Sequence, residues 1–375
     1  MKLRLQSQDL VKELSLAQGV VERKVTIPML ENVLLTAKGG ALELTTTNLE
    51  LGFRTSCEAT VEEEGTIALP MLRLYEYVRL LPGQPMKIST TPTDAVSISS
   101  GSAKTRISGV DPRNFPKLAD MPSDLVELPA RPLLEAIRRT IISVSTETSH
   151  YSLAGALLLI RPEALGIVST DGHRLSLYFE EQELPEVTDA IEGLVPRKAM
   201  AELQKILEDG TGSKDEPGVV AFGTAKKNMF FQSGRRLFVV QKMTGKFPNY
   251  RRVLPKDSAI TLELNNHRLA QVLRRVSQFS DQRSRAVRFE LENGKLQIEA
   301  AISQFGSSKE SLLVDYEGTS LGIGFNAQYI IDFLGVCGSE QVLMQLRDAK
   351  GAAQFVVPDM PKQTDYRYVI MPIRV

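Results

Sequence analysis

Tryptophan is absent from this 375-residue chain, and cysteine and histidine are scarce. The two cysteines, Cys57 and Cys337, are too few for a disulfide framework or for a zinc site of their own. We expect both to be buried thiols in a reducing compartment. No Arg-Gly-Gly or aromatic motif for stacking nucleotide bases occurs.

The chain has no excess of charge of either sign, with 45 basic and 45 acidic residues. This balance excludes a uniformly basic nucleic-acid-binding chain, although one basic surface could be offset by an acidic one. Long apolar runs are also missing, and residues 1–5 lack the apolar core of a signal peptide. We therefore expect a cytoplasmic protein with no membrane partner.

Catalytic signatures are equally scarce. The chain contains neither a GxSxG nucleophile motif nor a phosphate-binding GxxxxGK[ST] loop. Only Asp171 and His173, in the run Thr-Asp-Gly-His-Arg-Leu at residues 170–175, could form an acid–base pair, and a hydrolase using them is the alternative reading. Asp171 lies 123 residues after Asn48, at an equivalent strand end, which favours a structural turn. We expect no enzyme, no metal and no cofactor.

The chain carries one structural plan three times. Leu10 and Leu133 each open an apolar helical stripe and are 123 residues apart, as are Leu42 and Leu165 in a following strand. Leu269 opens the same stripe in a third copy. A repeat of this length is a whole domain, and the expected boundaries are 1–121, 122–250 and 251–375.

The apolar pattern of each copy predicts a helix, then strands, a second helix and more strands. Period-two runs such as residues 41–45 and 295–299 predict strands, and Asn293-Gly294 predicts a tight hairpin. Second helices are expected after Pro70 and Pro196, with an apolar stripe in copy one at Leu72, Tyr75 and Val78. Short strands joined by tight turns are antiparallel, so the fold class is α+β with helices on sheets.

Two features of the sequence, the paired arginines and the apolar C-terminal segment, each allow two interpretations. Arg138-Arg139 and Arg274-Arg275 occupy the same repeat position, either as solvated helix surface or as a shared surface for a polyanion. The apolar end at residues 368–375 is either a final strand or the lining of a peptide-binding groove.

Four motifs occur in order along the chain: the run at residues 170–175, Val-Pro-Arg-Lys at 195–198, Phe-Pro-Asn-Tyr-Arg-Arg-Val-Leu-Pro at 247–255, and the closing Met-Pro-Ile-Arg-Val at 371–375. Together they resemble the bacterial sliding clamp family, that of the β subunit of DNA polymerase III. The resemblance spans the whole chain and includes the triplication. It implies three similar domains of the DNA-clamp type, with antiparallel sheets outside and two helices per domain lining a ring.

The resemblance also implies a function and partners. A ring-shaped homodimer would encircle double-stranded DNA without reading its sequence and would confer processivity by tethering the polymerase. Partners would be the DNA polymerase III alpha subunit, the clamp loader, other polymerases and repair proteins, each binding through a short glutamine- and leucine-containing peptide. A clamp relative specialised for another partner or for drug resistance is a further reading.

Three sets of residues follow from the resemblance. The peptide pocket would comprise Leu153, Thr170, Gly172, His173, Arg174, Leu175, Pro248, Arg252, Val253, Val369, Met371, Pro372, Ile373 and Arg374. The DNA-facing residues would be Lys24, Arg73, Tyr151, Arg197 and Lys198, and the dimer interface would include Ile107 and Phe279. Many family members end in Met-Arg-Leu, so the ending Ile373-Arg374-Val375 departs from the pattern and bears on partner preference.

Overall fold

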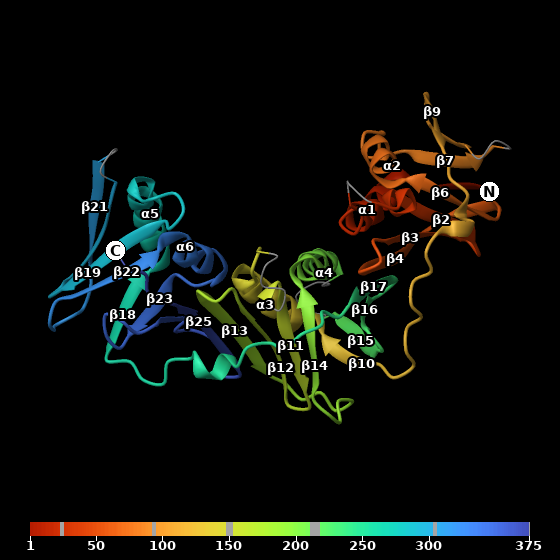
Figure 1. Ribbon diagram of the computed structural model, residues 1–375. Helices are drawn as coiled ribbons and strands as arrows, with labels where there is room; N and C mark the ends of the chain where they lie inside the picture. Colours follow the sequence, from red (N-terminus) through yellow and green to blue (C-terminus); the bar gives the residue numbers. More distant parts are fainter. Residues whose placement is uncertain (23–25, 92–94, 148–152, 211–217, 303–305, 375) are drawn as a thin grey trace. The chain divides into compact units, whose positions relative to one another are not determined.

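A computed structural model describes residues 1–22, 26–91, 95–147, 153–210, 218–302 and 306–374. The described residues form six α-helices and antiparallel sheets, which confirms the α+β class (Figure 1). The chain divides into two compact units, Met1–Arg131 with Lys198–Lys242, and Pro132–Arg197 with Met243–Val375. Lys24 and Tyr151 lie outside the described residues.

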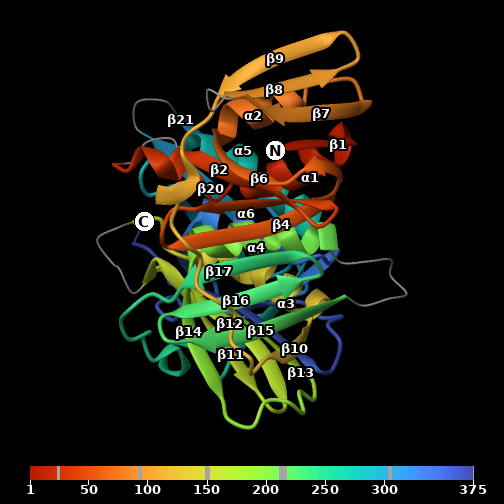
Figure 2. The ribbon, with the colours of Figure 1, turned by 90° about the vertical axis from the view of Figure 1, so that its right-hand side faces the viewer.

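The first unit contains two antiparallel sheets. The five-stranded sheet has the order β5-β1-β7-β8-β9 and the eight-stranded sheet the order β10-β15-β16-β17-β4-β3-β2-β6 (Figure 2). Their bounds are β1 Lys2–Gln6, β2 Asn32–Lys38, β3 Ala41–Thr47, β4 Leu51–Glu58, β5 Thr60–Glu63, β6 Gly65–Pro70, β7 Pro85–Thr90, β8 Ala95–Ser100, β9 Ala103–Ser108, β10 Val126–Pro129, β15 Val219–Ala225, β16 Asn228–Ser233 and β17 Arg236–Gln241.

The second unit repeats this pattern with an eight-stranded sheet of order β14-β11-β12-β13-β25-β24-β23-β18 and a four-stranded sheet of order β21-β20-β19-β22. Their bounds are β11 Gly155–Arg161, β12 Ala164–Thr170, β13 Arg174–Glu181, β14 Ile191–Pro196, β18 Ile260–Asn265, β19 Ala286–Glu292, β20 Lys295–Ile302, β21 Gly306–Leu313, β22 Leu321–Asn326, β23 Gln341–Leu346, β24 Ala353–Val356 and β25 Thr364–Ile370. All of these ladders are antiparallel.

The helices confirm the repeat. The first helices of the three copies are α1 Ser7–Ala17, α3 Ala130–Thr140 and α5 Asn266–Val276, and the second are α2 Met71–Val78, α4 Arg197–Gly210 and α6 Ala327–Val336. Leu10, Leu133 and Leu269 are at most 1% exposed, so each opens a buried stripe as predicted. Apolar burial of this kind on one helix face is the main driving force for docking a helix on its sheet.

One detail of the helix prediction is wrong. In α2 the buried positions are Met71, Leu74 and Val78, whereas Leu72 and Tyr75 are only half-buried. The start of the helix is as predicted, because α2 begins at Met71, directly after Pro70, which closes β6 and stands at the N-cap position. Tertiary packing selects among alternative apolar stripes, which periodicity alone leaves undecided.

Candidate functional site

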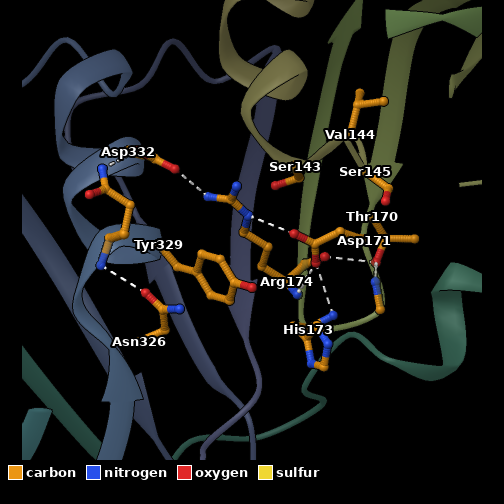
Figure 3. A network of polar contacts seen from close by, with 12 residues as sticks. Ser143, Val144, Ser145, Thr170, Asp171, His173, Arg174, Asn326, Tyr329 and Asp332 are labelled. Atoms are coloured by element: carbon orange, nitrogen blue, oxygen red, sulfur yellow. Dashed lines mark hydrogen bonds and ion pairs between the residues drawn. The ribbon is translucent and has the colours of Figure 1, made fainter. Parts of the chain in front are cut away.

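The run at residues 170–175 forms a tight turn between β12 and β13. The Asp171 Oδ1 accepts hydrogen bonds from the backbone N–H groups of His173 and Arg174, both at 2.9 Å. The Thr170 hydroxyl donates to the Arg174 carbonyl at 2.7 Å and accepts from the Gly172 N–H at 3.1 Å. Gly172 has φ +90°, a conformation that glycine adopts at no steric cost. Figure 3 shows this turn beside the Arg174 side chain.

The first copy contains the same turn with no ionisable pair. The Asn48 Oδ1 accepts from the N–H groups of Glu50 at 3.1 Å and Leu51 at 2.7 Å, and Thr47 donates to the Leu51 carbonyl at 2.8 Å. Leu49 stands in the place of Gly172, with φ +77°. Asp171 is therefore first of all a turn-forming residue. No group of three or more His, Cys, Asp or Glu side chains that could hold a metal occurs among the described residues.

What the second copy adds is a network centred on Arg174. Its guanidinium contacts Asp171 Oδ2 at 3.0 Å and Asp332 Oδ2 at 2.6 Å, and donates to the Tyr368 hydroxyl at 3.3 Å (Figure 3). It also lies 4.2 Å from the centroid of the Tyr329 ring. Burial lowers the pKa of Arg174, but the tyrosine and the two carboxylates outweigh it, so the pKa lies above its usual value. The arginine is thus a fixed positive charge held by several partners.

Three of these partners, Tyr329, Asp332 and Tyr368, were not predicted from the sequence as site residues. Tyr329 and Asp332 are three residues apart on α6, and this spacing places them on the same helix face. The Tyr368 hydroxyl in turn donates to the Tyr329 carbonyl at 2.8 Å, so β25 and α6 are tied together at the same point. The signal that could have identified them is a tyrosine and an acid at helical spacing within an otherwise apolar stripe.

A cavity of about 340 Å³ opens beside this network. Its lining residues are Ile142, Val144, Ser145, Thr146, Glu147, Asp171, His173, Arg174, Arg197, Tyr329 and Asp332. Arg197 is half-buried in its wall and donates to the backbone carbonyl oxygens of Ile141 and Val144. Burial and the neighbouring charge of Arg174 lower the pKa of Arg197. The cavity presents donors and acceptors together, which suits an uncharged polar group.

An apolar cluster lies beneath the turn. Leu175 and Val369 are each 1% exposed and lie opposite one another in the β13–β25 ladder. They pack with Phe247, and the half-buried Tyr250 and Leu254 lie against the same cluster. The Met371 N–H donates to the His173 carbonyl at 2.8 Å. Segments near residues 170–175, 247–254 and 369–371, which are far apart in the sequence, therefore meet at one place.

The remaining predicted pocket residues surround this cluster. Val253 and Met371 are each 42% exposed, which is unusual for large apolar side chains. Leu153, Pro372 and Ile373 are half-buried, and the Ile373 N–H donates to the Gly324 carbonyl at 2.9 Å. The other exposed members are Gly172, His173, Pro248, Arg252 and Arg374.

Of the predicted DNA-facing residues, Arg197 lies in the wall of the cavity, whereas the other described ones and the predicted interface residues do not line it. Arg73 is exposed on α2, and the Lys198 Nζ is 3.1 Å from Glu22 Oε1. Ile107 is half-buried on β9, and Phe279 is half-buried in the 3-10 helix η6, Ser277–Phe279.

The paired arginines of the first helices are not a uniform solvated surface. Arg139 is 13% exposed and packs over the Tyr366 ring at 5.0 Å, and Arg275 pairs with Glu310 at 2.6 Å. Arg138 is 42% exposed and pairs with Glu135 at 3.3 Å. Three of the four arginines therefore pair with two carboxylates of the same chain, Glu135 and Glu310.

The fold and the site together define a triplicated clamp of the DNA-clamp type with a polar cavity beside an apolar cluster. Family models of the DNA polymerase III beta subunit match in order: the N-terminal domain at residues 1–119, the central domain at 127–249 and the C-terminal domain at 251–374. The beta sliding clamps of Pseudomonas putida and Caulobacter vibrioides are each 33% identical to this chain, with all of both chains covered.

Solved structures agree. A sliding clamp of Pseudomonas aeruginosa bound to griselimycin superposes with a TM-score of 0.91 at 31% identity, and that of Caulobacter crescentus with 0.88 at 31%; both cover all of both chains. The chain therefore belongs to the DNA polymerase III beta subunit family, the beta sliding clamps. Its function is that of a DNA sliding clamp, a non-catalytic processivity factor in replication, and the hydrolase reading has no support. None of the helices in the described residues has the length and apolar character needed to cross a bilayer.

Proposed function

We propose that two copies of this chain form a ring-shaped homodimer that encircles duplex DNA in the cytoplasm and tethers the replicative polymerase. Each copy would contribute three clamp domains, at residues 1–121, 122–250 and 251–375. Processivity would then come from topology and from the raised local concentration of polymerase.

Strand order is the observation that carries this proposal. Each eight-stranded sheet joins two half-sheets through one ladder, β4 with β17 in the first unit and β13 with β25 in the second. The two smaller sheets end at β9 and β21. In its half of the repeat β9 holds the position that β17 holds in the next copy, and β21 holds the position that β4 holds in the first copy. Among the described residues, β9 pairs only with β8 and β21 only with β20. Figure 2 shows β9 at the end of its sheet.

Unpaired edge strands of this length are templates for pairing with another chain. If β9 of one copy pairs with β21 of the other, the two small sheets become one continuous sheet like the other two. The same contact made twice closes the assembly, because a head-to-tail contact that closes gives a ring. Ile107 and Phe279 would lie in this contact.

The interaction with DNA would be electrostatic and diffuse. Lys24, Arg73, Tyr151, Arg197 and Lys198 would face the duplex. A formal net charge of zero and the pairing of Lys198 with Glu22 keep the attraction weak, which permits sliding.

The peptide segments of polymerases, of the clamp loader and of repair proteins would bind over the apolar cluster. Val253 and Met371 would contact the leucine and aromatic side chains of the peptide. The cavity beside Arg174 would receive its glutamine amide, because that group both donates and accepts hydrogen bonds. The residues of this pocket would be the fourteen that the resemblance implies.

A loading assay tests the topological mechanism. The protein, loaded on nicked circular DNA by a clamp loader, should remain bound in salt that disrupts phosphate contacts and should leave when the circle is linearised. Retention on linear DNA with free ends, or rapid loss from closed circles at moderate salt, would contradict it.

A further inference from the structure

The segment between β17 and β18 carries positive charge that the chain itself leaves unpaired. Its exposed cations are Lys246, Arg251, Arg252 and Lys256. In the described part of the chain none of these four forms an ion pair, unlike the arginines of the polar network and of the first helices. Asp257 is the only acid between residues 244 and 257, so four cations and one acid leave this stretch with a net charge of +3.

The same segment is fixed in place by side chains that pack into the apolar cluster. Phe247 is 9% exposed, and Tyr250 and Leu254 are half-buried against the cluster. Between them the chain forms η5, Tyr250–Arg252, the short green helix before β18 in Figure 1. This single turn leaves both of its arginines and the following Val253 on the outside. The cations therefore stand on an anchored backbone beside an exposed apolar side chain.

The first copy contains the same segment. Phe115-Pro116 follows β9 as Phe247-Pro248 follows β17, and Phe115 is likewise buried. Counting from this shared pair, the half-buried Leu118 holds the place of Tyr250. Leu118 packs on β4, because a Cβ on Gly52 would lie 2.4 Å from its side chain. The apolar residues that dock the segment on its sheet are thus common to both copies.

The charged positions are the ones that differ between the copies. Ala119-Asp120 stands in the first copy where Arg251-Arg252 stands in the second. Met121, in the place of Val253, is half-buried against an apolar cluster of the first unit. Packing of the segment therefore requires neither arginine. The positive charge and the exposed valine of the second copy are additions that the fold does not need, which indicates a role in binding a partner.

We propose that this segment recognises acidic residues in the partner peptide, next to its leucine on the side away from the glutamine. The inference rests on the proposed binding of the peptide over the apolar cluster. Carboxylates of the peptide would pair with Arg251 and Lys256, and with Arg252 at the edge of the pocket. The lining of the cavity beside Arg174, as far as the structure describes it, includes no residue of the segment. The amide and the carboxylates are therefore recognised at separate places.

A peptide fits this surface better than a strand of nucleic acid does. The cations lie near Val253 and Met371, two aliphatic side chains that are each 42% exposed. Such side chains accept a leucine but offer no flat ring on which a base could stack. The aromatic ring of the segment, that of Tyr250, is half-buried, and the Arg251 guanidinium lies over it at 5.9 Å from its centroid.

Peptide titration at two ionic strengths tests the proposal. Three synthetic peptides share one core of glutamine, leucine and phenylalanine and differ in the next three residues, which are all aspartate, all asparagine or all lysine. By calorimetry at low ionic strength, the aspartate peptide should bind about tenfold more tightly than the asparagine peptide, because each exposed ion pair adds a little free energy. In about 1 M salt, where the Debye length is about 3 Å, the difference should fall below about twofold.

Charge variants separate local pairing from a general effect of net charge. Arg251→Ser with Lys256→Ser should remove the preference for aspartate at low ionic strength. Arg251→Glu with Lys256→Glu should transfer the preference to the lysine peptide, which a purely structural role of these residues would not produce. The matched control is Lys38→Ser with Lys227→Ser, which removes two exposed lysines of the first unit and should keep the preference.

The outcomes distinguish failure of this inference from failure of the pocket. Equal binding of the aspartate and asparagine peptides at low ionic strength, or loss of the preference in the control, would overturn the proposal and leave the pocket intact. Binding of an oligothymidylate through Arg251 and Lys256, without any charge preference among the peptides, would assign the segment to nucleic acid instead. Failure of all three peptides to bind the unsubstituted protein would overturn the pocket and the proposal together.

Discussion

The joint between β4 and β17 is locked by a buried ion pair, and its removal should destabilise the first unit strongly. Glu13 of α1 is fully buried, and its carboxylate accepts from Arg236 at 2.8 and 3.0 Å and from the Thr55 hydroxyl at 2.6 Å. Arg236 also pairs with Asp209. Burial raises the pKa of the Glu13 carboxyl, but the hydrogen bonds from Arg236 and Thr55 outweigh it and hold the pKa below its usual value.

We expect Glu13→Gln to reduce the free energy of unfolding of the first unit by about 3 kcal/mol, the lower end of the range for breaking a buried pair, because Asp209 still neutralises Arg236. For a unit of this size each kcal/mol corresponds to a fall of about 2–4 °C in Tm, so the transition should move down by about 6–12 °C. Differential scanning calorimetry measures it, since the two units need not unfold together.

The matched control is Glu43→Gln, which removes an exposed carboxylate of β3 and should cost less than about 0.5 kcal/mol. A double change of Glu13→Leu and Arg236→Met should recover part of the loss, because an apolar pair avoids the desolvation of both charges. If Glu13→Gln behaves like the control, the buried pair does not stabilise the joint and the reasoning is wrong.

The pH dependence has a definite sign. A carboxyl whose pKa is lower in the folded state contributes stability above its unfolded pKa, near 4.5, and loses that stability as the pH falls through the folded value. The gap in Tm between the unsubstituted protein and Glu13→Gln should therefore be constant near neutral pH and narrow progressively below about pH 4.5. A gap that widens on acidification would refute this assignment.

Two further outcomes are predicted. Asp171→Asn should keep the turn, as Asn48 does in the first copy. Asp171→Ala should lose two hydrogen bonds worth about 1 kcal/mol each and weaken binding of a glutamine- and leucine-containing peptide about tenfold or more, as measured by titration calorimetry. Equal effects of the two substitutions on peptide binding would contradict the turn assignment. When the dimer is diluted, the two copies should separate while hydrogen exchange of the backbone amides in β4 and β13 stays slow. Fast exchange in β4 or β13 at the same dilution would place the weakest joint within the chain.

The repeat made part of the fold predictable. The α1 and α3 helices begin and end 123 residues apart, as do β2 and β11, β3 and β12, and β4 and β13. Local patterns predict such elements well because burial of one face imposes the period of the apolar residues. The phase of α2 was mispredicted because Leu72 and Met71 are both apolar and only packing distinguishes them.

The site was predictable only where it is continuous in sequence. The turn at residues 170–175 stood out, but Arg174 meets Asp332 and Tyr368, which are 158 and 194 residues away. No local pattern specifies such a meeting, because it depends on how β13 pairs with β25 and where α6 docks. Tyr368 looked like an ordinary apolar strand residue, yet its fully buried ring carries a hydroxyl with two hydrogen-bond partners.

The repeat also explains why the proposed joint between copies should be the one that opens. At the first intrachain joint, between β4 and β17, Thr55 and Arg236 both bind the buried Glu13. At the second, between β13 and β25, the counterpart of Thr55 is Tyr178, which lies opposite Tyr366, and the Arg139 guanidinium packs over both rings. On the edge strand β21 the corresponding position is Glu310, which is already bound by Arg275 of its own copy at 2.6 and 2.7 Å. No side chain at this position would lock the two copies together. A ring that must admit DNA needs one weak joint, and these substitutions place it where two chains meet rather than within one.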